Sequence, residues 1–123
     1  PGDAEKGKAL FVQRCAACHS IKGVVDGGQM GPDLTNVWAH SAAKVADFQY
    51  SPAFTDLMVA WDRFSLNHFL ANPQGYIKGT AMAAPPVTDP QQRRDLVAFL
   101  RAHSDKDDFI GSGGSPELSG KQD

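Results

Sequence analysis

Apolar residues recur at three- and four-residue steps in three segments of the chain, which is the spacing of amphipathic helices. The first segment spans residues 3 to about 15 and places Leu10 and Phe11 on one side. Asp3 precedes this pattern and can act as its N-cap. Glu5 follows in the first turn, where the helix dipole favours a negative charge. The pattern therefore predicts an N-terminal helix.

Two further helices are predicted in the second half of the chain. One covers residues 62–71 and ends at Asn72-Pro73, because the residue before a proline disfavours helical geometry. The last has Asp89 as N-cap and Pro90 at its first position, and its apolar stripe runs to about His103. Twelve glycines and eight prolines in 123 residues predict long loops between these few helices.

Gly7 lies inside the first predicted helix and allows two interpretations. Either another helix crosses closely at this point, or the glycine is simply tolerated at a cost of about 1 kcal/mol relative to alanine. The spacing alone does not separate them.

Long stretches between and after the helices lack a helical pattern. Residues 33–60 show weak periodicity and predict only short helical turns, and residues 72–87 predict a loop interrupted by proline and glycine. The pattern is lost again after residue 104. We therefore expect one domain over residues 1–104, followed by a flexible Gly/Ser-containing tail over residues 105–123.

Charge and hydropathy exclude several classes of function. The formal net charge is −2, and no basic patch predicts binding to nucleic acid or to anionic lipid. No stretch approaches the roughly 20 apolar residues of a membrane span, so membrane insertion is not expected. No apolar signal region precedes Asp3, as in a mature chain. A chain of 13.2 kDa is marginal for a core of side chains alone, so a buried cofactor would help to fill it.

The most informative motif is Cys15-Ala16-Ala17-Cys18-His19, which has the pattern of a c-type haem attachment site. Each thiol can add to a porphyrin vinyl group as a thioether, and two intervening residues match the spacing of the two vinyls. The adjacent histidine then lies under the ring, where an imidazole nitrogen can reach the iron. The motif predicts one covalently attached haem c, with His19 as a ligand of its iron.

Two cysteines at this spacing allow three other interpretations. A thioredoxin-like redox pair needs a βαβ context, which the flanking sequence lacks. Half of a zinc site needs a second ligand pair, and neither another C-x-x-C nor a paired-histidine motif follows. A structural disulfide remains a simple alternative in a small exported domain.

A haem iron needs its second axial position filled or deliberately left open. Six residues are candidates for it: Met30, Met58, Met82, His40, His68 and His103. Met82 is distinguished by its place on a long loop, where the backbone can arch over the ring. A thioether ligand raises the reduction potential, whereas a second imidazole lowers it. Position therefore favours Met82, and the other candidates stay open.

Other residues could support a haem. The carbonyl of Pro32 could accept a hydrogen bond from the His19 ring, which would fix its tautomer, although an ordinary loop proline is the simpler interpretation. Large aromatic residues are dense in an otherwise loop-like region: Trp38, Phe48, Tyr50, Phe54 and Trp61. They could cover a haem face, with Tyr50 and Trp61 reaching propionates, or they could be ordinary core residues.

Taken together, these residues resemble class I cytochromes c, and within them the mitochondrial and cytochrome c2 type. The resemblance runs from Gly2 to about Ser104. Its motifs are the first helix, Cys15 to His19, Gly31-Pro32-Asp33-Leu34, Asn72-Pro73, Tyr76-Ile77, Gly79-Thr80-Ala81-Met82, and Asp95 to Leu100.

The resemblance implies an all-α fold in which the first and last helices cross, plausibly at Gly7, and long loops wrap one haem. It implies His19 and Met82 as axial ligands, with Pro32 supporting the histidine. It implies that Tyr50 and Trp61 hydrogen-bond a propionate inside the protein, with Thr80 near the Met82 sulfur and its hydroxyl available to a propionate. Phe69 would face the methionine.

The sequence also departs from the family. His40 stands where an arginine commonly lies near a propionate, so the potential could depend on pH, and a potential flat from pH 5 to 8 would count against this. Phe69 replaces a frequent tyrosine and so removes a hydroxyl near the methionine. Lysines that ring the haem edge in mitochondrial proteins are missing here, where the stretches read Gln74-Gly75 and Thr88-Asp89. Arg14 and Lys78 remain, so long-range steering toward an acidic partner should be weak.

The function expected from the sequence is one-electron transfer and not enzymatic catalysis. The partners would be membrane or soluble redox proteins that dock briefly at the exposed haem edge, and the chain would be a monomer. Thioether attachment implies the periplasm, or the mitochondrial intermembrane space in a eukaryote, and suggests a role in a respiratory chain. The alternative is a haem peroxidase or ligand-binding sensor with a displaceable Met82 and His68 as its polar group.

Overall fold

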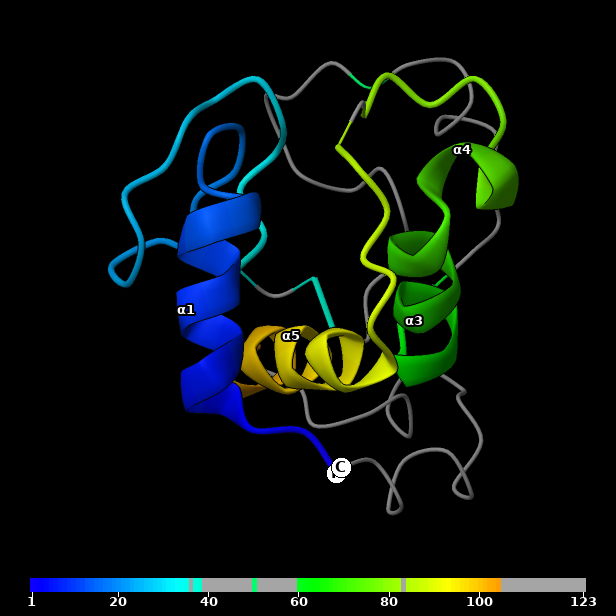
Figure 1. Cartoon of the computed structure of the whole chain (residues 1–123). Coiled ribbons are helices and arrows are strands. Elements are labelled where there is room, and N and C mark those ends of the chain that lie inside the picture. The colour runs from blue at the N-terminus through cyan, green and yellow to red at the C-terminus, as the bar shows by residue number, and fades with distance from the viewer. Residues whose placement is uncertain (36, 39–49, 51–59, 83, 105–123) are drawn as a thin grey trace.

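Four helices form the regular structure in the computed structural model, which describes residues 1–35, 37–38, 50, 60–82 and 84–104 (Figure 1). They are α1 (Ala4–Arg14), α3 (Arg63–Ala71), α4 (Pro73–Tyr76) and α5 (Pro90–Ala102). An isolated antiparallel bridge pairs Ile21 with Val25. The all-α expectation is therefore confirmed. No helix in this part of the chain is long and apolar enough to cross a membrane.

The ends of the long helices follow the capping signals in the sequence. Asp3 accepts hydrogen bonds from the backbone of Glu5 at 2.9 Å and of Lys6 at 3.1 Å, which satisfies two donors at the start of α1. Asp89 does the same for Gln91 at 2.9 Å at the start of α5. Both helices lie within a residue or two of their predicted bounds.

Helix α3 begins with a capping box. The Asp62 carboxylate accepts from the backbone of Ser65, and the Ser65 hydroxyl accepts from the backbone of Asp62 at 2.9 Å. Helix α4 corrects the expectation of a loop over residues 72–87. Its single turn forms because Asn72 accepts from the backbone of Gly75 at 3.1 Å, while Pro73 occupies the first helical position.

Helices α1 and α5 lie across one another (Figure 1). Gly7 lies at their contact, which decides between the two interpretations of this glycine. A Cβ atom there would lie 1.9 Å from the carbonyl oxygen of Asp95 and 2.8 Å from the Cβ of Phe99. Next to the crossing, the Phe11 and Phe99 rings pack with centroids 5.4 Å apart. The Asp95 carboxylate also accepts from the backbone of Asp3 at 2.9 Å, which fastens the two helices together.

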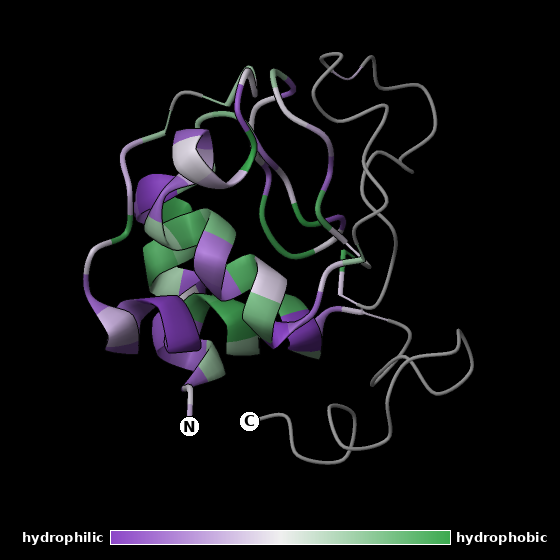
Figure 2. Ribbon diagram, turned by 90° about the vertical axis from the view of Figure 1, so that its right-hand side faces the viewer, coloured by the Kyte–Doolittle hydropathy of each residue, from purple (hydrophilic) through white to green (hydrophobic). Residues whose placement is uncertain are grey.

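The core lies between the helices and the loops that connect them. Hydrophobic residues of the helices gather on their inner sides in Figure 2, and the side chains with the least exposure are Trp38, Phe11, Phe99, Ile21 and Leu96. Trp38 is wholly buried and its backbone N–H donates to the Ser104 hydroxyl at 3.1 Å. For Trp38, the interpretation as an ordinary core residue therefore holds.

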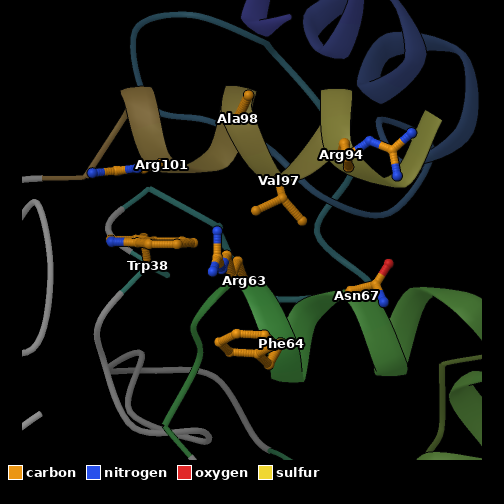
Figure 3. A pocket seen from close by; sticks show the side chains of 8 residues that line it. All are labelled: Trp38, Arg63, Phe64, Asn67, Arg94, Val97, Ala98 and Arg101. Atoms are coloured by element: carbon orange, nitrogen blue, oxygen red, sulfur yellow. The ribbon is translucent and has the colours of Figure 1, made fainter. Parts of the chain in front are cut away.

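A hollow of about 240 Å³ opens between α3 and α5, with Trp38 at one end (Figure 3). Its described lining is Trp38, Arg63, Phe64, Asn67, Arg94, Val97, Ala98 and Arg101. The Arg63 guanidinium lies 4.8 Å from the Phe64 ring centroid, and that of Arg101 lies 5.3 Å from Trp38. None of Cys15, Cys18, His19 and Met82 lines this hollow.

Candidate haem site

The Cys15 to His19 motif forms a tight turn directly after α1. The backbone N–H groups of Cys18 and His19 both donate to the carbonyl of Cys15, at 3.1 and 2.9 Å. This turn keeps the chain compact where the helix ends at its C-cap, Cys15. Both cysteines are half-buried, and no disulfide joins them. The disulfide alternative is therefore wrong for this structure, and both sulfurs are available for thioether formation.

The His19 ring is held in one orientation by its surroundings. Its Nδ1 lies 2.7 Å from the carbonyl oxygen of Pro32. A carbonyl only accepts, so Nδ1 carries the proton and Nε2 keeps its lone pair for a metal. A Cβ at Gly31 would lie 2.3 Å from the ring's Cε1, so the loop can pass this close only with glycine there.

A small polar network holds the loop that carries Pro32. The Asp33 carboxylate accepts from the Ser20 hydroxyl at 2.5 Å and from the backbone of Thr35 at 2.9 Å. The Thr35 hydroxyl accepts from the backbone of Lys22 at 2.8 Å. Burial raises the pKa of Asp33, but the hydrogen bonds from Ser20 and Thr35 and the charge of Lys22 outweigh it, so the net pKa is lowered. The ionised carboxylate thus ties the two ends of the loop together.

Burial is the largest influence on the pKa values of Cys15 and His19. Burial raises the pKa of the Cys15 thiol to about 11, although the Arg14 charge opposes the shift. Burial lowers the pKa of His19, against the opposing effects of the Pro32 bond and the Asp33 charge. The neutral imidazole favoured by this environment is the form that binds a metal.

Side chains bind both the N–H and the carbonyl of Met82, in the segment Thr80-Ala81-Met82 that we call the Met82 segment. Met82 is partly buried and packs against the core. Its N–H donates to the hydroxyl of the buried Thr80 at 3.3 Å. Its carbonyl accepts from Gln74 Nε2 at 3.1 Å, and the same nitrogen donates to the carbonyl of Thr80 at 2.9 Å. These contacts of Gln74 were not predicted from the sequence, which marks this residue only as a position without the family's lysine.

A cavity of about 330 Å³ is lined by Cys15 of the attachment motif and by Met82, whereas Cys18 and His19 are not among its lining residues. Its lining residues come from α1, from the end of α3 and α4, and from the segment that follows Met82: Gln13, Arg14, Cys15, Leu70, Pro73, Met82, Ala84, Pro85 and Val87. Cys15 and Met82, 67 positions apart in the sequence, therefore line the same cavity. This mostly apolar lining suits a porphyrin.

The predicted aromatic residues lie in different settings. Trp61 is buried with its ring edge-on to Phe69 at 5.4 Å, and Phe69 in turn contacts Tyr76 at 6.5 Å. Tyr50 is half-buried. His68, the polar group of the sensor alternative, is exposed and stacks on Tyr76 at 6.0 Å. His40, Phe48, Phe54 and Met58 lie outside the described residues.

The donor set fits a c-type haem. Two free thiols and an imidazole with an available Nε2 come from one turn, and a thioether faces the same cavity as the first thiol. The described residues contain no group of three or more histidine, cysteine, aspartate or glutamate side chains that could hold a metal ion by themselves. A zinc site built from these residues therefore has no support in the described part of the chain.

Comparisons with known proteins agree with this chemistry. The family model for cytochrome c matches residues 4–104. Among curated proteins, the chain is 39% identical over 102 residues to a cytochrome c from Guizotia abyssinica, covering 82% of this chain and 90% of the relative. It is 37% identical over 102 residues to one from Gossypium barbadense, with the same coverage. It is 38% identical over 99 residues to one from Cochliobolus lunatus, covering 80% of this chain and 91% of the relative.

Motif, fold and relatives lead to one conclusion. The haem motif follows α1, the terminal helices α1 and α5 cross, and the match to the family spans nearly all of the described chain. The chain therefore belongs to the cytochrome c family and is an electron carrier with one covalently bound c-type haem.

Proposed function

We propose that Cys15 and Cys18 hold the haem as thioethers and that His19 and Met82 are its axial ligands. The observation that carries this proposal is the cavity lined by both Cys15 and Met82. The bond from His19 Nδ1 to Pro32 supports it, because it directs the unprotonated Nε2 to a metal. The bound haem supplies an iron that cycles between the ferric and ferrous states.

The residues around the iron are arranged to keep its coordination unchanged. Pro32 fixes the His19 ring, and Thr80 and Gln74 fix the backbone of Met82. With both axial positions filled, a substrate has no place on the metal. A thioether favours the ferrous state and raises the potential. Such fixed ligands suit rapid electron transfer, since little has to move when the charge changes.

Polar contacts to the haem propionates form the next part of the proposal. We assign them to Tyr50, Trp61 and Thr80. Thr80 is buried, and its hydroxyl accepts from Met82 while its own proton stays available to another acceptor. Phe69, buried against Trp61, contributes no hydroxyl on that side.

The proposed partners are membrane or soluble redox proteins that dock briefly at the haem edge. Arg14 is exposed there and donates to Gln92 at 3.2 Å, and Lys78 is also exposed. Small apolar residues, Ala84 and Pro85, line the same cavity. We infer that docking depends more on apolar contact than on lysine charge, which suits a transient monomer-to-partner encounter without nucleic acid or membrane insertion.

Thioether attachment places the proposed site of action outside the cytoplasm. The relatives come from eukaryotes and favour the mitochondrial intermembrane space, whereas they give no support to the periplasm. A role in a respiratory chain is part of the same proposal. We also propose residues 1–104 as the haem domain and 105–123 as a separate tail, in agreement with the family match over residues 4–104.

Reductive titration of the purified haem protein, with and without cyanide, tests this function. A carrier should show one reversible one-electron wave and bind cyanide or carbon monoxide only slowly at neutral pH. Rapid binding of either ligand by the native protein would favour the peroxidase or sensor alternative. Parallel titrations from pH 5 to 8 test the proposed influence of His40, which predicts a potential that falls as pH rises.

A further inference from the structure

The side-chain amide of Gln74 contacts the backbone of the Met82 segment at two points. Its Nε2 lies 2.9 Å from the carbonyl oxygen of Thr80 and 3.1 Å from that of Met82. A carboxamide nitrogen has two N–H bonds, so both carbonyls can be served at once. Both partners only accept, so the amide must turn its nitrogen and not its oxygen toward them.

The short helix α4 places Gln74 for this contact. Asn72 accepts from the backbone of Gly75 at 3.1 Å, and the buried Pro73 accepts from the backbone of Ile77 at 3.0 Å. These bonds fix the single turn that carries Gln74. The chain then returns through the left-handed Gly79, with φ of 83°, and passes within reach of the amide. Glycine suits this reversal because it has no Cβ to clash.

Within the described part of the chain, other groups hold the segment elsewhere and leave the two carbonyls to Gln74. The Thr80 hydroxyl accepts from the N–H of Met82 at 3.3 Å. Further along, Val87 donates to the carbonyl of Leu70 at 2.9 Å and accepts from Arg93 Nη1 at 2.7 Å. The segment is thus fastened at its far end by α3 and α5, and at the Met82 end by α4.

We propose that Gln74 is a positioning residue for Met82, and this inference rests on the proposed role of Met82 as an axial ligand. By donating to both carbonyls, Gln74 keeps the methionine side chain directed into the cavity that it shares with Cys15. Loss of the donors frees the segment to move away, so the iron position that Met82 fills becomes accessible more often. The Gln74 side chain is exposed, yet its amide nitrogen is engaged by the carbonyls of Thr80 and Met82, so it serves the ligand more than partner docking.

Three substitutions separate hydrogen-bond donation from the mere presence of a side chain. Gln74→Met keeps the length and removes the donors, Gln74→Glu presents acceptors to two carbonyls at pH 7, and Gln74→Arg restores donors. Gln92→Met is the matched control, because the bond that Gln92 accepts runs from Arg14 between α1 and α5 and is not made to the backbone of the Met82 segment. All four are compared with the wild type as haem-loaded full-length proteins.

Two readouts report on the segment. The first is the rate at which the ferric protein binds cyanide at pH 7, recorded with the long-wavelength absorption band of sulfur bound to ferric iron. The second is the hydrogen-exchange rate of the Met82 backbone amide, which measures opening of the segment and does not depend on the reactivity of the haem.

We expect Gln74→Met to raise both rates about three- to tenfold, since tenfold corresponds to about 1.4 kcal/mol, near the net worth of one neutral hydrogen bond. Gln74→Glu should raise them further, and Gln74→Arg should return them to within about twofold of the wild type. Steering of the cyanide anion by the new charges would give the opposite order for the cyanide rate. The Gln92→Met rates should match the wild type.

Rates for Gln74→Met within twofold of the wild type would overturn the inference. So would equal increases in all three Gln74 variants, because these would reflect side-chain packing and not donation. If the wild type shows the sulfur band and the Gln74 variants keep the wild-type cyanide-binding and hydrogen-exchange rates, the role of Gln74 is overturned but the ligation by Met82 is not. A wild type without the band overturns both the role of Gln74 and the ligation by Met82.

Discussion

Gly7→Ala is the substitution that most sharply tests the crossing of α1 and α5. The new Cβ would lie 1.9 Å from the carbonyl oxygen of Asp95, 2.7 Å from its carbonyl carbon and 2.8 Å from the Cβ of Phe99. Ordinary van der Waals contact begins at 3.4 Å. The nearest obstacles belong to the backbone of α5 and cannot rotate away, so the two helices must separate.

Two opposing terms set the magnitude. Alanine is the better helix former by about 1 kcal/mol. Overpacking of a well-packed core costs about 1–3 kcal/mol, and here it also strains the hydrogen bond from the backbone of Asp3 to Asp95. Because the overlap is with backbone atoms, we expect the upper end of that range or beyond. The predicted net loss is about 2 kcal/mol, a large part of the stability of a small domain.

Urea unfolding of the haem-loaded protein, followed by far-ultraviolet circular dichroism, measures this loss. Ala9→Gly is the control, because Ala9 is exposed on the same helix and its change should cost only about 1 kcal/mol through helix propensity. A Gly7→Ala protein as stable as the wild type, or more stable, would refute the close crossing.

Three further substitutions test other parts of the structure. Asp33→Asn should destabilise the protein at pH 7 by less than about 1 kcal/mol, because the carboxylate is partly solvated. Since folding lowers the pKa of Asp33, its contribution to stability is present above the unfolded-state pKa and is lost as pH falls through the folded-state pKa. The stability of the variant should therefore depend less on pH below about pH 4 in acid unfolding. Phe11→Ala should cost about 3–5 kcal/mol in urea unfolding, since the ring is 1% exposed and packs on Phe99; a loss under 1 kcal/mol would contradict that packing. Asp89→Ala should cost about 1 kcal/mol by removal of the α5 cap, and an unchanged unfolding midpoint would show that the cap is unimportant.

The parts of the fold that could be predicted are those encoded by local sequence. The caps Asp3 and Asp89 act on residues two or three positions away, so the starts of α1 and α5 follow from spacing alone. The Cys15 to His19 motif is likewise local. The role of Gly7 could not be decided from its own helix, because the atoms that exclude a side chain there belong to Asp95 and Phe99.

The missed features depend on how the chain returns in space. Helix α4 is a single turn whose cap is one hydrogen bond, which the Asn72 side chain accepts from the backbone of Gly75. So short a pattern does not stand out in a stretch rich in proline and glycine. The contacts of Gln74 depend on the path of the chain six to eight residues later. The sequence places Trp38 among the aromatic residues that could cover a haem face, but the structure has it wholly buried beside Arg101 of α5. The sequence offers little to predict such features: at Gln74 its one signal is a residue type that differs from the lysine expected in the cytochrome c family.

The visible spectrum of the ferric protein tests the central claim, ligation by His19 and Met82, most directly. The wild type should show the weak long-wavelength band of sulfur bound to ferric iron, and Met82→Ala should lose it. Met30→Ala should keep it, because that methionine is 84% exposed. A wild type without the band, or a Met82→Ala protein that retains it, would contradict the assignment of Met82.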